Sequence, residues 1–317
     1  MKFTFHNDLE RSENCIKNIK VSPIFYMGNK KRLIQNGLLD LFPNDINTFY
    51  DLFGGSGVVA LNVEANKYIL NELDNNIYNL YVVLKNNDPE EIINHIENMI
   101  REYNLPNKST NSVSTSKEER EYYKRNYMNF RSQYNKNKNP LDLFVLMNYC
   151  LSQTMRFNNK GEFNMPFGNN RFIKEKHSQY YIDFYNKLNE DNFIITNKSF
   201  DEYDTVQFNS DDLVYLDPPY LHTTATYNEN GKWTEINQRN LMDFCEGLNN
   251  SNIRWAMSNV FKNKDFENQE LVDWCDKNLF NIYCFDKFSY HSYGRGDANT
   301  KEVLITNYYN ANIKINT

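Results

Sequence analysis

The chain has 317 residues, of which 40% are hydrophobic and 24% are charged, and its formal net charge is −6. It contains no run of about 18 apolar residues, and charged residues interrupt its first segment, MKFTFHNDLERSEN, so neither a membrane-spanning helix nor a signal peptide is expected. The length suits a catalytic domain with a modest second domain, and we expect it in the cytoplasm.

The five cysteines are scattered, without the CxxC spacing of a zinc site or the density of a disulfide scaffold. We therefore expect no metal and interpret the cysteines as reduced structural residues: Cys15, Cys150, Cys245, Cys275 and Cys284.

The basic residues are concentrated in the middle of the chain. Residues 101–180 hold 14 Lys and Arg against 7 Asp and Glu, whereas the rest of the chain holds 21 against 34. A basic segment between acidic flanks is typical of an embedded module that binds a polyanion, although solvated helices also give such an imbalance.

The first strong strand-turn-helix pattern lies at residues 46–66. An apolar strand from Ile46 to Phe53 runs into a glycine-rich loop, and a helical pattern begins at Val58. A second strand, KYILNEL (67–73), follows directly. This βαβ start predicts a parallel sheet.

The pattern from Asn76 to about Lys138 is helical, broken by a polar stretch at 108–116 that we interpret as an exposed loop. The last two of the strand patterns that follow have no helix between them, which predicts an antiparallel hairpin at the sheet edge. The fold class is therefore α/β with seven strands. The five later strand patterns are 193–197, 212–217, 253–259, 281–288 and 301–309.

The loop DLFGGSG, from Asp51 to Gly57, places glycines where the first strand turns into its helix, so a ligand can lie against the backbone there. A tight turn without a ligand is the alternative. Glu72 ends the second strand, where Rossmann-like sheets place an acid that binds ribose hydroxyls. No P-loop signature is present, so a triphosphate is not expected.

The segment DLVYLDPPYLH (212–222) ends a strand with an acid, two prolines and a tyrosine. An exocyclic amine of a base becomes a better nucleophile if Asp217 and the Pro218 carbonyl both accept hydrogen bonds from it. Pro219 offers no competing N–H, and Tyr220 can stack on a base pulled out of a duplex. A strand-ending turn with a buried tyrosine is the alternative.

Five segments in this order closely resemble the Dam-type DNA adenine-N6 methyltransferases, with the alpha arrangement of motifs. They are SPIFYMGNKKRLI (22–34), DLFGGSG (51–57), RFNNKGEFNMPFG (156–168), DPPY (217–220) and KEVLITNY (301–308). The resemblance implies S-adenosylmethionine as methyl donor, site-specific double-stranded DNA as substrate, and a Rossmann-like seven-stranded methyltransferase fold. It also implies an inserted, mainly helical DNA-recognition domain that carries a β-hairpin. We expect residues 1–80 and 190–317 to form the catalytic domain and 81–189 the inserted one.

The resemblance also implies site residues. It places Asp217, Pro218, Pro219 and Tyr220 in catalysis. Two departures from the family pattern are Asn29, where relatives have glycine, and Ser199, where an acid is usual. The residues expected to bind the cofactor are Tyr26, Lys30, Asp51, Phe53, Gly55, Gly57, Glu72, Phe200 and Asp217.

The pattern of the segment RFNNKGEFNMPFG (156–168) predicts a hairpin, with Gly161 in the left-handed turn position. A two-stranded ribbon fits a major groove, where Arg156 can donate two hydrogen bonds to guanine. A phosphate contact or a plain surface role for that arginine stays open. Five residues before Arg156, members of the family often have an aromatic residue, whereas this chain has Leu151. The residues expected to contact DNA are Arg156, Asn158, Pro166, Lys232 and Arg295; His291 is a further candidate, and 222–238 is expected to close over the base.

Other chemistries fit less well. Methylation at cytosine C5 needs a cysteine nucleophile, usually after a proline, and no proline here precedes a cysteine. Cytosine N4 enzymes tend to have Ser, and glutamine-methylating enzymes Asn, in place of Asp217. Two alternative functions stay open: an RNA adenine methyltransferase and a non-catalytic DNA-binding protein on this scaffold. The sequence also leaves open the recognised DNA site (GATC or another), the existence of a cognate restriction endonuclease, and whether the protein is a monomer or a weak dimer.

Overall fold

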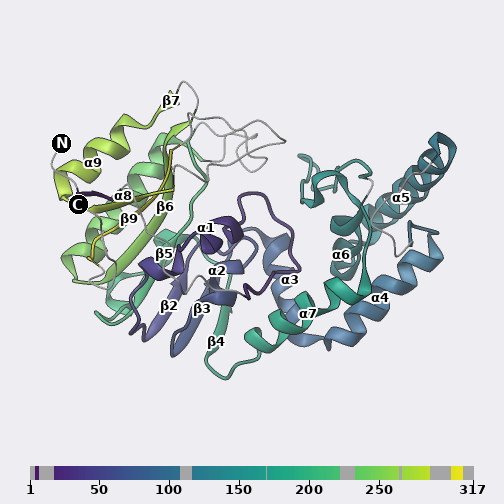
Figure 1. Ribbon diagram of the computed structural model, residues 1–317, viewed down its shortest axis with the longest axis horizontal. Helices are drawn as coiled ribbons and strands as arrows, with labels where there is room; N and C mark the ends of the chain where they lie inside the picture. Colours follow the sequence, from purple (N-terminus) through teal and green to yellow (C-terminus); the bar gives the residue numbers. More distant parts are fainter. Residues whose placement is uncertain are drawn as a thin grey trace.

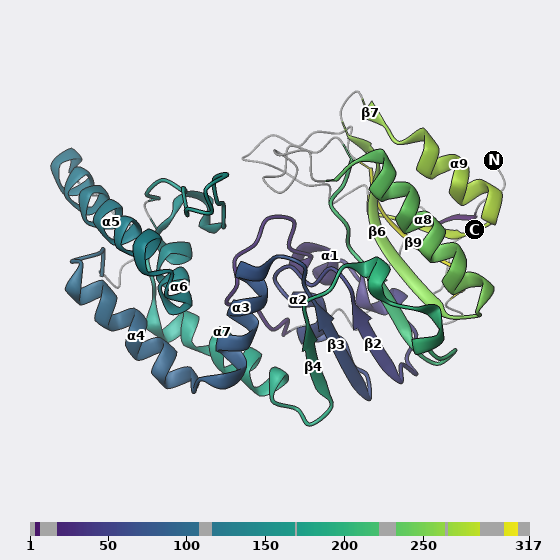
Figure 2. The same ribbon diagram turned by 180° about the vertical axis from the view of Figure 1, so that it is seen from behind.

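The computed structural model describes residues 4–6, 18–107, 116–168, 170–221, 233–263, 266–285 and 301–309. Figure 1 shows a sheet with helices on its faces, and a second part in which α4, α5 and α6 lie together away from the strands. Helix α7 runs from that part back toward β4, as Figure 2 shows from behind. No helix in these ranges has the length and apolar character needed to cross a membrane.

The strands of the described residues form one nine-stranded sheet in the order β1-β8-β9-β6-β5-β2-β3-β4, with β7 paired to β6. Neighbours are parallel from β6 to β4 and between β1 and β8, whereas β9 is antiparallel to both its neighbours. The strands are β1 (Thr4–His6), β2 (Thr48–Asp51), β3 (Lys67–Asn71), β4 (Phe193–Thr196), β5 (Leu213–Leu216), β6 (Arg254–Asn263), β7 (Phe266–Glu267), β8 (Asn281–Cys284) and β9 (Lys301–Thr306).

Each of the seven segments predicted as strands overlaps one, although β6 extends beyond the predicted 253–259, and the antiparallel pairing predicted for the last two is confirmed by β8 and β9. The predicted position of that hairpin at the sheet edge is wrong, because β1 pairs with β8 on its outer side. The sheet also has two strands more than the seven predicted. Strands β1 and β7 have only three and two residues, too few for an alternating pattern to mark them.

The long helical pattern predicted from Asn76 resolves into three helices. The side chains of Asp88 and Ser116 accept hydrogen bonds from backbone N–H groups in the first turns of α4 and α5, which fixes where those helices begin. The predicted loop at 108–116 lies outside the described residues except for Ser116. The helices are α1 (Lys31–Gln35), α2 (Val58–Asn62), α3 (Asn75–Asn86), α4 (Pro89–Glu102), α5 (Lys117–Asn137), α6 (Pro140–Tyr149), α7 (Lys174–Leu188), α8 (Glu235–Asn250) and α9 (Gln269–Asn278), with 3-10 turns η1 (Leu39–Leu41), η2 (Leu151–Gln153), η3 (Phe200–Glu202) and η4 (Thr205–Gln207).

The sheet separates two apolar cores, because successive side chains of a strand point to opposite faces. In β5, Leu213 and Tyr215 pack in the core that contains α2, α3 and α7, whereas Val214 and Leu216 pack in the core that contains α8 and α9. The first core continues without a break into α4, α5 and α6. The part with α4, α5 and α6 therefore shares one apolar core with the sheet, and this core fixes the position of the two parts relative to each other. Among the described residues, four cysteines are buried, and no disulfide joins any of them.

Candidate active site

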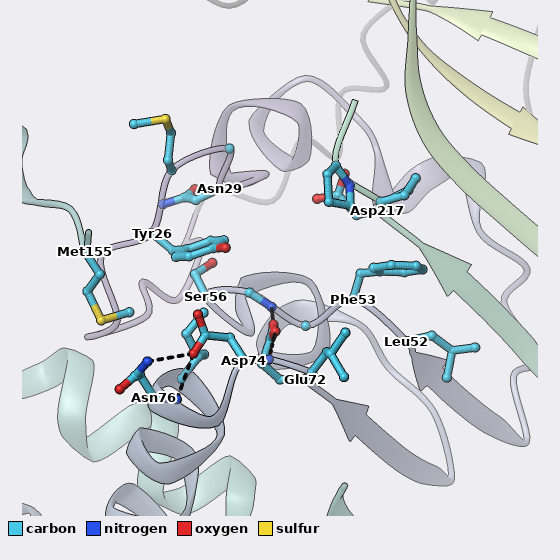
Figure 3. Close-up of a pocket in the computed structure, with 18 of the residues that line it drawn as sticks. Tyr26, Asn29, Leu52, Phe53, Ser56, Glu72, Asp74, Asn76, Met155 and Asp217 are labelled. Atoms are coloured by element: carbon cyan, nitrogen blue, oxygen red, sulfur yellow. Dashed lines mark hydrogen bonds between the residues drawn. The ribbon is translucent and has the colours of Figure 1, made fainter. Parts of the chain in front are cut away.

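A cavity of about 950 Å³ lies at the carboxyl ends of β2, β3 and β5. Side chains from widely separated segments line it, as Figure 3 shows: Tyr26 before α1, Phe53 after β2, Glu72 after β3 and Asp217 after β5, with Met155 on the opposite wall. Parallel strands bring their carboxyl ends to the same edge of the sheet, so sequence segments far apart converge there.

The glycine loop forms the floor of this cavity. Its Gly55 and Gly57 have φ of +54° and +71°, the left-handed region that favours glycine. A β-carbon at Gly57 would lie 2.7 Å from the ring of Phe184, so a larger residue would also displace α7. Gly55 lines the cavity next to Tyr26, whereas Gly57 caps α2 and does not line it. The tyrosine hydroxyl of Tyr81 donates to the Gly55 carbonyl over 2.7 Å, which fixes the loop from below.

Glu72 holds the loop from the side. Its two carboxylate oxygens accept hydrogen bonds from the backbone N–H groups of Gly55 (2.7 Å) and Asp74 (2.8 Å). Burial raises the pKa of Glu72 to about 7, against the effect of these donors. The carboxyl group therefore changes charge near neutral pH at the wall of the cavity.

Asp51 is the most buried acid of the cavity, with 1% of its surface exposed. Burial raises its pKa well above the usual range, and the nearby Asp217 and Glu72 raise it further. Its Oδ1 atom has no hydrogen-bond partner among the described residues. Buried polar atoms are nearly always satisfied, so this oxygen fits a site whose ligand brings a positive charge or a donor.

Asp217 follows β5 and ends on the cavity wall, with 18% of its side chain exposed. Its Oδ2 lies 2.8 Å from the Lys30 ammonium, and its Oδ1 accepts from the Tyr220 hydroxyl over 3.2 Å. Burial raises the pKa of Asp217, while Lys30 and the Tyr220 hydrogen bond lower it. Pro218 and Pro219 line the cavity beside it, but Tyr220 does not, and its ring centre lies 5.1 Å from Lys30 Nζ.

The model of the family described as D12 class N6 adenine-specific DNA methyltransferase matches residues 26–290. This chain belongs to that family. Membership implies the use of S-adenosylmethionine, and the mostly parallel sheet with helices is consistent with the fold of such methyltransferases. The resemblance described above on the motifs is thereby confirmed.

Several curated relatives of this D12-class chain are similar over most of its length. The modification methylase StsI of Streptococcus sanguinis is 37% identical over 308 residues, which is 94% of this chain and 44% of that protein. The type II methyltransferase M.FokI of Planomicrobium okeanokoites is 37% identical over 303 residues, 91% of this chain and 43% of that protein. The DNA adenine methylase of Escherichia coli K12 is 28% identical over 217 residues, 65% of this chain and 69% of that protein. The chain thus spans less than half the length of the first two.

The hairpin of this family member reaches the same cavity. Backbone hydrogen bonds join Asn158 with Glu162 and Arg156 with Asn164, and Gly161 has φ of +70°, as predicted for its turn position. Arg156 and Asn158 line the cavity, whereas Pro166 is exposed and lies outside it. Lys232, His291 and Arg295 and the predicted closing loop up to 232 lie outside the described residues.

Three residues at the site were missed by sequence reasoning. Asn71 lies behind the glycine loop, where its side chain donates to the carbonyls of Leu52 and Lys198 and accepts from Thr196, Lys198 and Tyr203. Trp233 packs within 6.2 Å of the rings of Phe53 and Phe200 on the cavity wall. Oε1 of Glu302 on β9 lies 3.2 Å from the Tyr220 hydroxyl, within hydrogen-bond distance. Asn71 directly precedes Glu72 at the end of β3, so its position in the sequence could have identified it. Trp233 and Glu302 reach the site only through contacts between distant segments of the chain.

Proposed function

We propose that this chain transfers a methyl group from S-adenosylmethionine to the N6 amino group of an adenine extruded from duplex DNA. The observation that carries this proposal is the position of Asp217, which directly follows β5 on the wall of the cavity that the glycine loop and Glu72 also line. One side of this cavity suits a nucleoside with a charged tail, and the other presents a carboxylate to a base. The family to which the chain belongs has the same activity in its description.

The residues of the cavity fit the cofactor. We assign Glu72 to the ribose hydroxyls, the Phe53 and Phe200 rings, 5.6 Å apart, to the adenine, and Tyr26, Gly55 and Asp51 to the methionine end. The unpaired Oδ1 of Asp51 suits an ammonium group there. When bound, the cofactor supplies a methyl group on a positively charged sulfur. Gly57 supports the loop from behind, and Lys30, which is paired with Asp217, serves the catalytic side.

On the catalytic side, Asp217 and the Pro218 carbonyl accept hydrogen bonds from the amino group of the target base. These bonds draw the nitrogen toward tetrahedral geometry and direct its lone pair into the cavity. The nearby Lys30 ammonium favours the charged form of Asp217, which is the stronger acceptor. We assign the Tyr220 ring to stacking on the base and Pro219 to stiffening the segment between them.

We further propose that residues 81–189 form a DNA-recognition domain inserted into a catalytic domain of residues 1–80 and 190–317, whose central sheet is the seven-stranded methyltransferase sheet extended by β1 and β7. The support is the separate position of α4, α5 and α6 in Figure 1 and the excess of basic residues at 101–180. Arg156 and Asn158 extend from the hairpin toward the cavity, and Pro166, Lys232 and Arg295 are assigned to DNA as well. The names of the relatives support a restriction-modification role with a cognate endonuclease. Because the proposed substrate is DNA, we also propose that the protein acts in the cytoplasm.

The decisive experiment is methyl transfer from labelled S-adenosylmethionine to unmodified genomic DNA, digested to nucleosides and identified by mass. We expect N6-methyladenine as the product and no methylated cytosine. Label in RNA but not in DNA would favour the RNA methyltransferase instead. No transfer to either, with DNA binding intact, would favour a non-catalytic DNA-binding protein.

Asn164 is expected to determine how faithfully Arg156 reads DNA. Its Oδ1 accepts from Nε of Arg156 over 2.9 Å, which leaves the two terminal nitrogens of the guanidinium to pair with guanine. We expect Asn164→Ala to reduce discrimination at the base pair read by this arginine by about tenfold. Methylation of a randomised DNA library, sequenced for modified sites, measures the change.

The matched variant is Asn164→Asp, which keeps an acceptor for the arginine and is expected to retain the sequence preference, with affinity lowered equally for all sites by its added negative charge. An unchanged preference in Asn164→Ala would show that the guanidinium is held by other means.

A further inference from the structure

Glu302 lies at the catalytic side of the cavity although it comes from the last strand of the sheet. It is paired with Val260 across β6 and β9, and only 9% of its side chain is exposed. A buried acid is costly unless it is paired or neutral. Neither the cofactor nor the DNA assignments above use it, so its presence requires an explanation.

The side chain belongs to a cluster of four, which we call the acid-tyrosine cluster: Lys30, Asp217, Tyr220 and Glu302. The Tyr220 hydroxyl lies 3.2 Å from Oδ1 of Asp217 and 3.2 Å from Oε1 of Glu302. The Lys30 ammonium lies 2.8 Å from Asp217 Oδ2 but 3.9 Å from Glu302 Oε1. The lysine is thus within hydrogen-bond distance of Asp217, whereas its ion pair with Glu302 is longer by about 1 Å.

This arrangement constrains where protons are. A phenol hydroxyl has one hydrogen, so Tyr220 can donate to one of the two carboxyl groups and must accept from the other. An ionised carboxylate has no hydrogen to give. At least one of the two acids therefore carries a proton if both contacts are hydrogen bonds. Since Lys30 is closer to Asp217, the charged form is favoured there and the proton belongs on Glu302.

We propose that Glu302 is a positioning residue for Asp217: as a neutral acid it donates to the Tyr220 hydroxyl, which donates to Asp217, while Lys30 pairs with the charged Asp217. This chain of hydrogen bonds fixes the rotamer of Asp217 and holds the Tyr220 ring where a base can stack. The effect on methyl transfer rests on the proposed function, whereas the hydrogen-bond arrangement belongs to the free protein.

The electrostatic surroundings agree with this assignment. Burial raises the pKa of Glu302, Lys30 lowers it, Asp217 raises it, and the Tyr220 hydrogen bond lowers it. For Asp217, burial also raises the pKa, but Lys30 opposes it both by charge and by a direct hydrogen bond. The acid that lies farther from the lysine is the one that keeps its proton in such a pair.

The first test uses infrared spectroscopy on the free protein at pH 7, comparing the wild type with Glu302→Gln. We expect the difference spectrum to show the carbonyl stretch of a protonated carboxylic acid in the wild type, shifted in D₂O and absent from the variant. A difference spectrum that shows only an ionised carboxylate would overturn the proposal. This result does not depend on methyl transfer, so it stays decisive even if the wild type fails to methylate DNA and the proposed function is rejected.

The second test separates positioning from charge in the active enzyme. Glutamine is neutral and can still donate to Tyr220, so Glu302→Gln is expected to keep kcat within about threefold, whereas Glu302→Ala is expected to lower kcat about tenfold or more. The KM values for DNA and cofactor should change less than about twofold in both. Exposed Glu267 on β7 provides the matched control, Glu267→Ala, expected to behave as the wild type. Wild-type kcat in Glu302→Ala, or an equal loss in both Glu302 variants, would contradict the proposal.

If Glu302→Ala does not fold, Tyr220→Phe provides a substitute, because it keeps the ring and removes the hydroxyl that links the two acids. We expect it to lower kcat about tenfold and to shift the carbonyl stretch of the protonated acid, because Glu302 loses its acceptor. Wild-type kcat in Tyr220→Phe, or an unchanged carbonyl stretch, would reject the proposed arrangement.

Discussion

Replacing Asp217 by Ala is expected to lower kcat for methyl transfer by roughly a thousandfold while DNA and cofactor still bind within a few-fold of the wild type. The reason is that the carboxylate is assigned to accept from the target amino group only as the nitrogen changes geometry. Lys30 is 5% exposed and would lose its 2.8 Å partner, so this variant is also expected to be less stable. Asp217→Asn keeps the shape and is expected to lose activity with a smaller loss of stability.

These losses are measured by single-turnover methylation and by filter binding of DNA, with thermal unfolding alongside. Asp243→Ala is the control, because Asp243 is an exposed acid of α8 outside the cavity. A wild-type rate in both Asp217 variants would remove the central residue of the proposed mechanism. A loss of rate that follows exactly the loss of folded protein would assign Asp217 to stability instead.

The parts of the site that lie next to each other in sequence could be predicted. Leu213–Leu216 forms a fully buried strand, and an acid follows it at the sheet edge where ligands bind. Gly55, Gly57 and Gly161 have positive φ, and each stood in a loop or turn pattern that requires it. Such local signals need only the order of a few residues and the geometry of the backbone.

The parts that depend on distant pairing could not be predicted. Glu302 meets Tyr220 only because β9 inserts between β8 and β6, an arrangement that no pattern within β9 contains. The same limit explains why the hairpin was placed at the sheet edge, since the covering strand β1 is three residues long. Tyr220 follows Asp217 closely in sequence, yet its ring lies next to Lys30 and does not line the cavity.

Three acidic residues that line the cavity are harder to ionise than usual because they are buried. Asp51, Glu72 and Asp217 all have raised pKa values, with burial as the largest cause in each. Of these, Asp217 has the Lys30 ammonium beside it, whereas Glu72 accepts hydrogen bonds from the backbone N–H groups of Gly55 and Asp74. In the free protein, the side of the cavity assigned to the cofactor therefore favours the uncharged forms of its acids, whereas a ligand that brings positive charge and hydroxyl donors favours the charged forms.

Glu72→Gln tests this effect of burial, and the variant is expected to gain stability relative to the wild type as pH rises but to bind the cofactor about a hundredfold more weakly. The pKa of Glu72 rises from 4.5 to about 7 on folding, so its contribution to stability is fully present below 4.5 and is lost as pH rises through 7. Glutamine is neutral at every pH, but its amide nitrogen cannot accept one of the two backbone hydrogen bonds that Gly55 and Asp74 donate to the carboxylate, which costs about 1 kcal/mol at every pH. The stability of the variant relative to the wild type should therefore rise by on the order of 2 kcal/mol between pH 4.5 and pH 8.

The Glu72→Gln substitution is expected to weaken cofactor binding, although it removes a buried charge. The ribose hydroxyls are assigned to donate to the charged carboxylate, so the wild type must release the Glu72 proton on binding, and its affinity should fall as pH drops below about 7. The variant lacks this proton and should bind weakly with no such dependence, because charge-assisted hydrogen bonds are about twice as strong as neutral ones. Calorimetric titration with S-adenosylhomocysteine at pH 6, 7 and 8, with thermal unfolding at each pH, measures both effects. Equal affinity of the two proteins at pH 8 would place the ribose elsewhere in the cavity, even if the difference in stability is found.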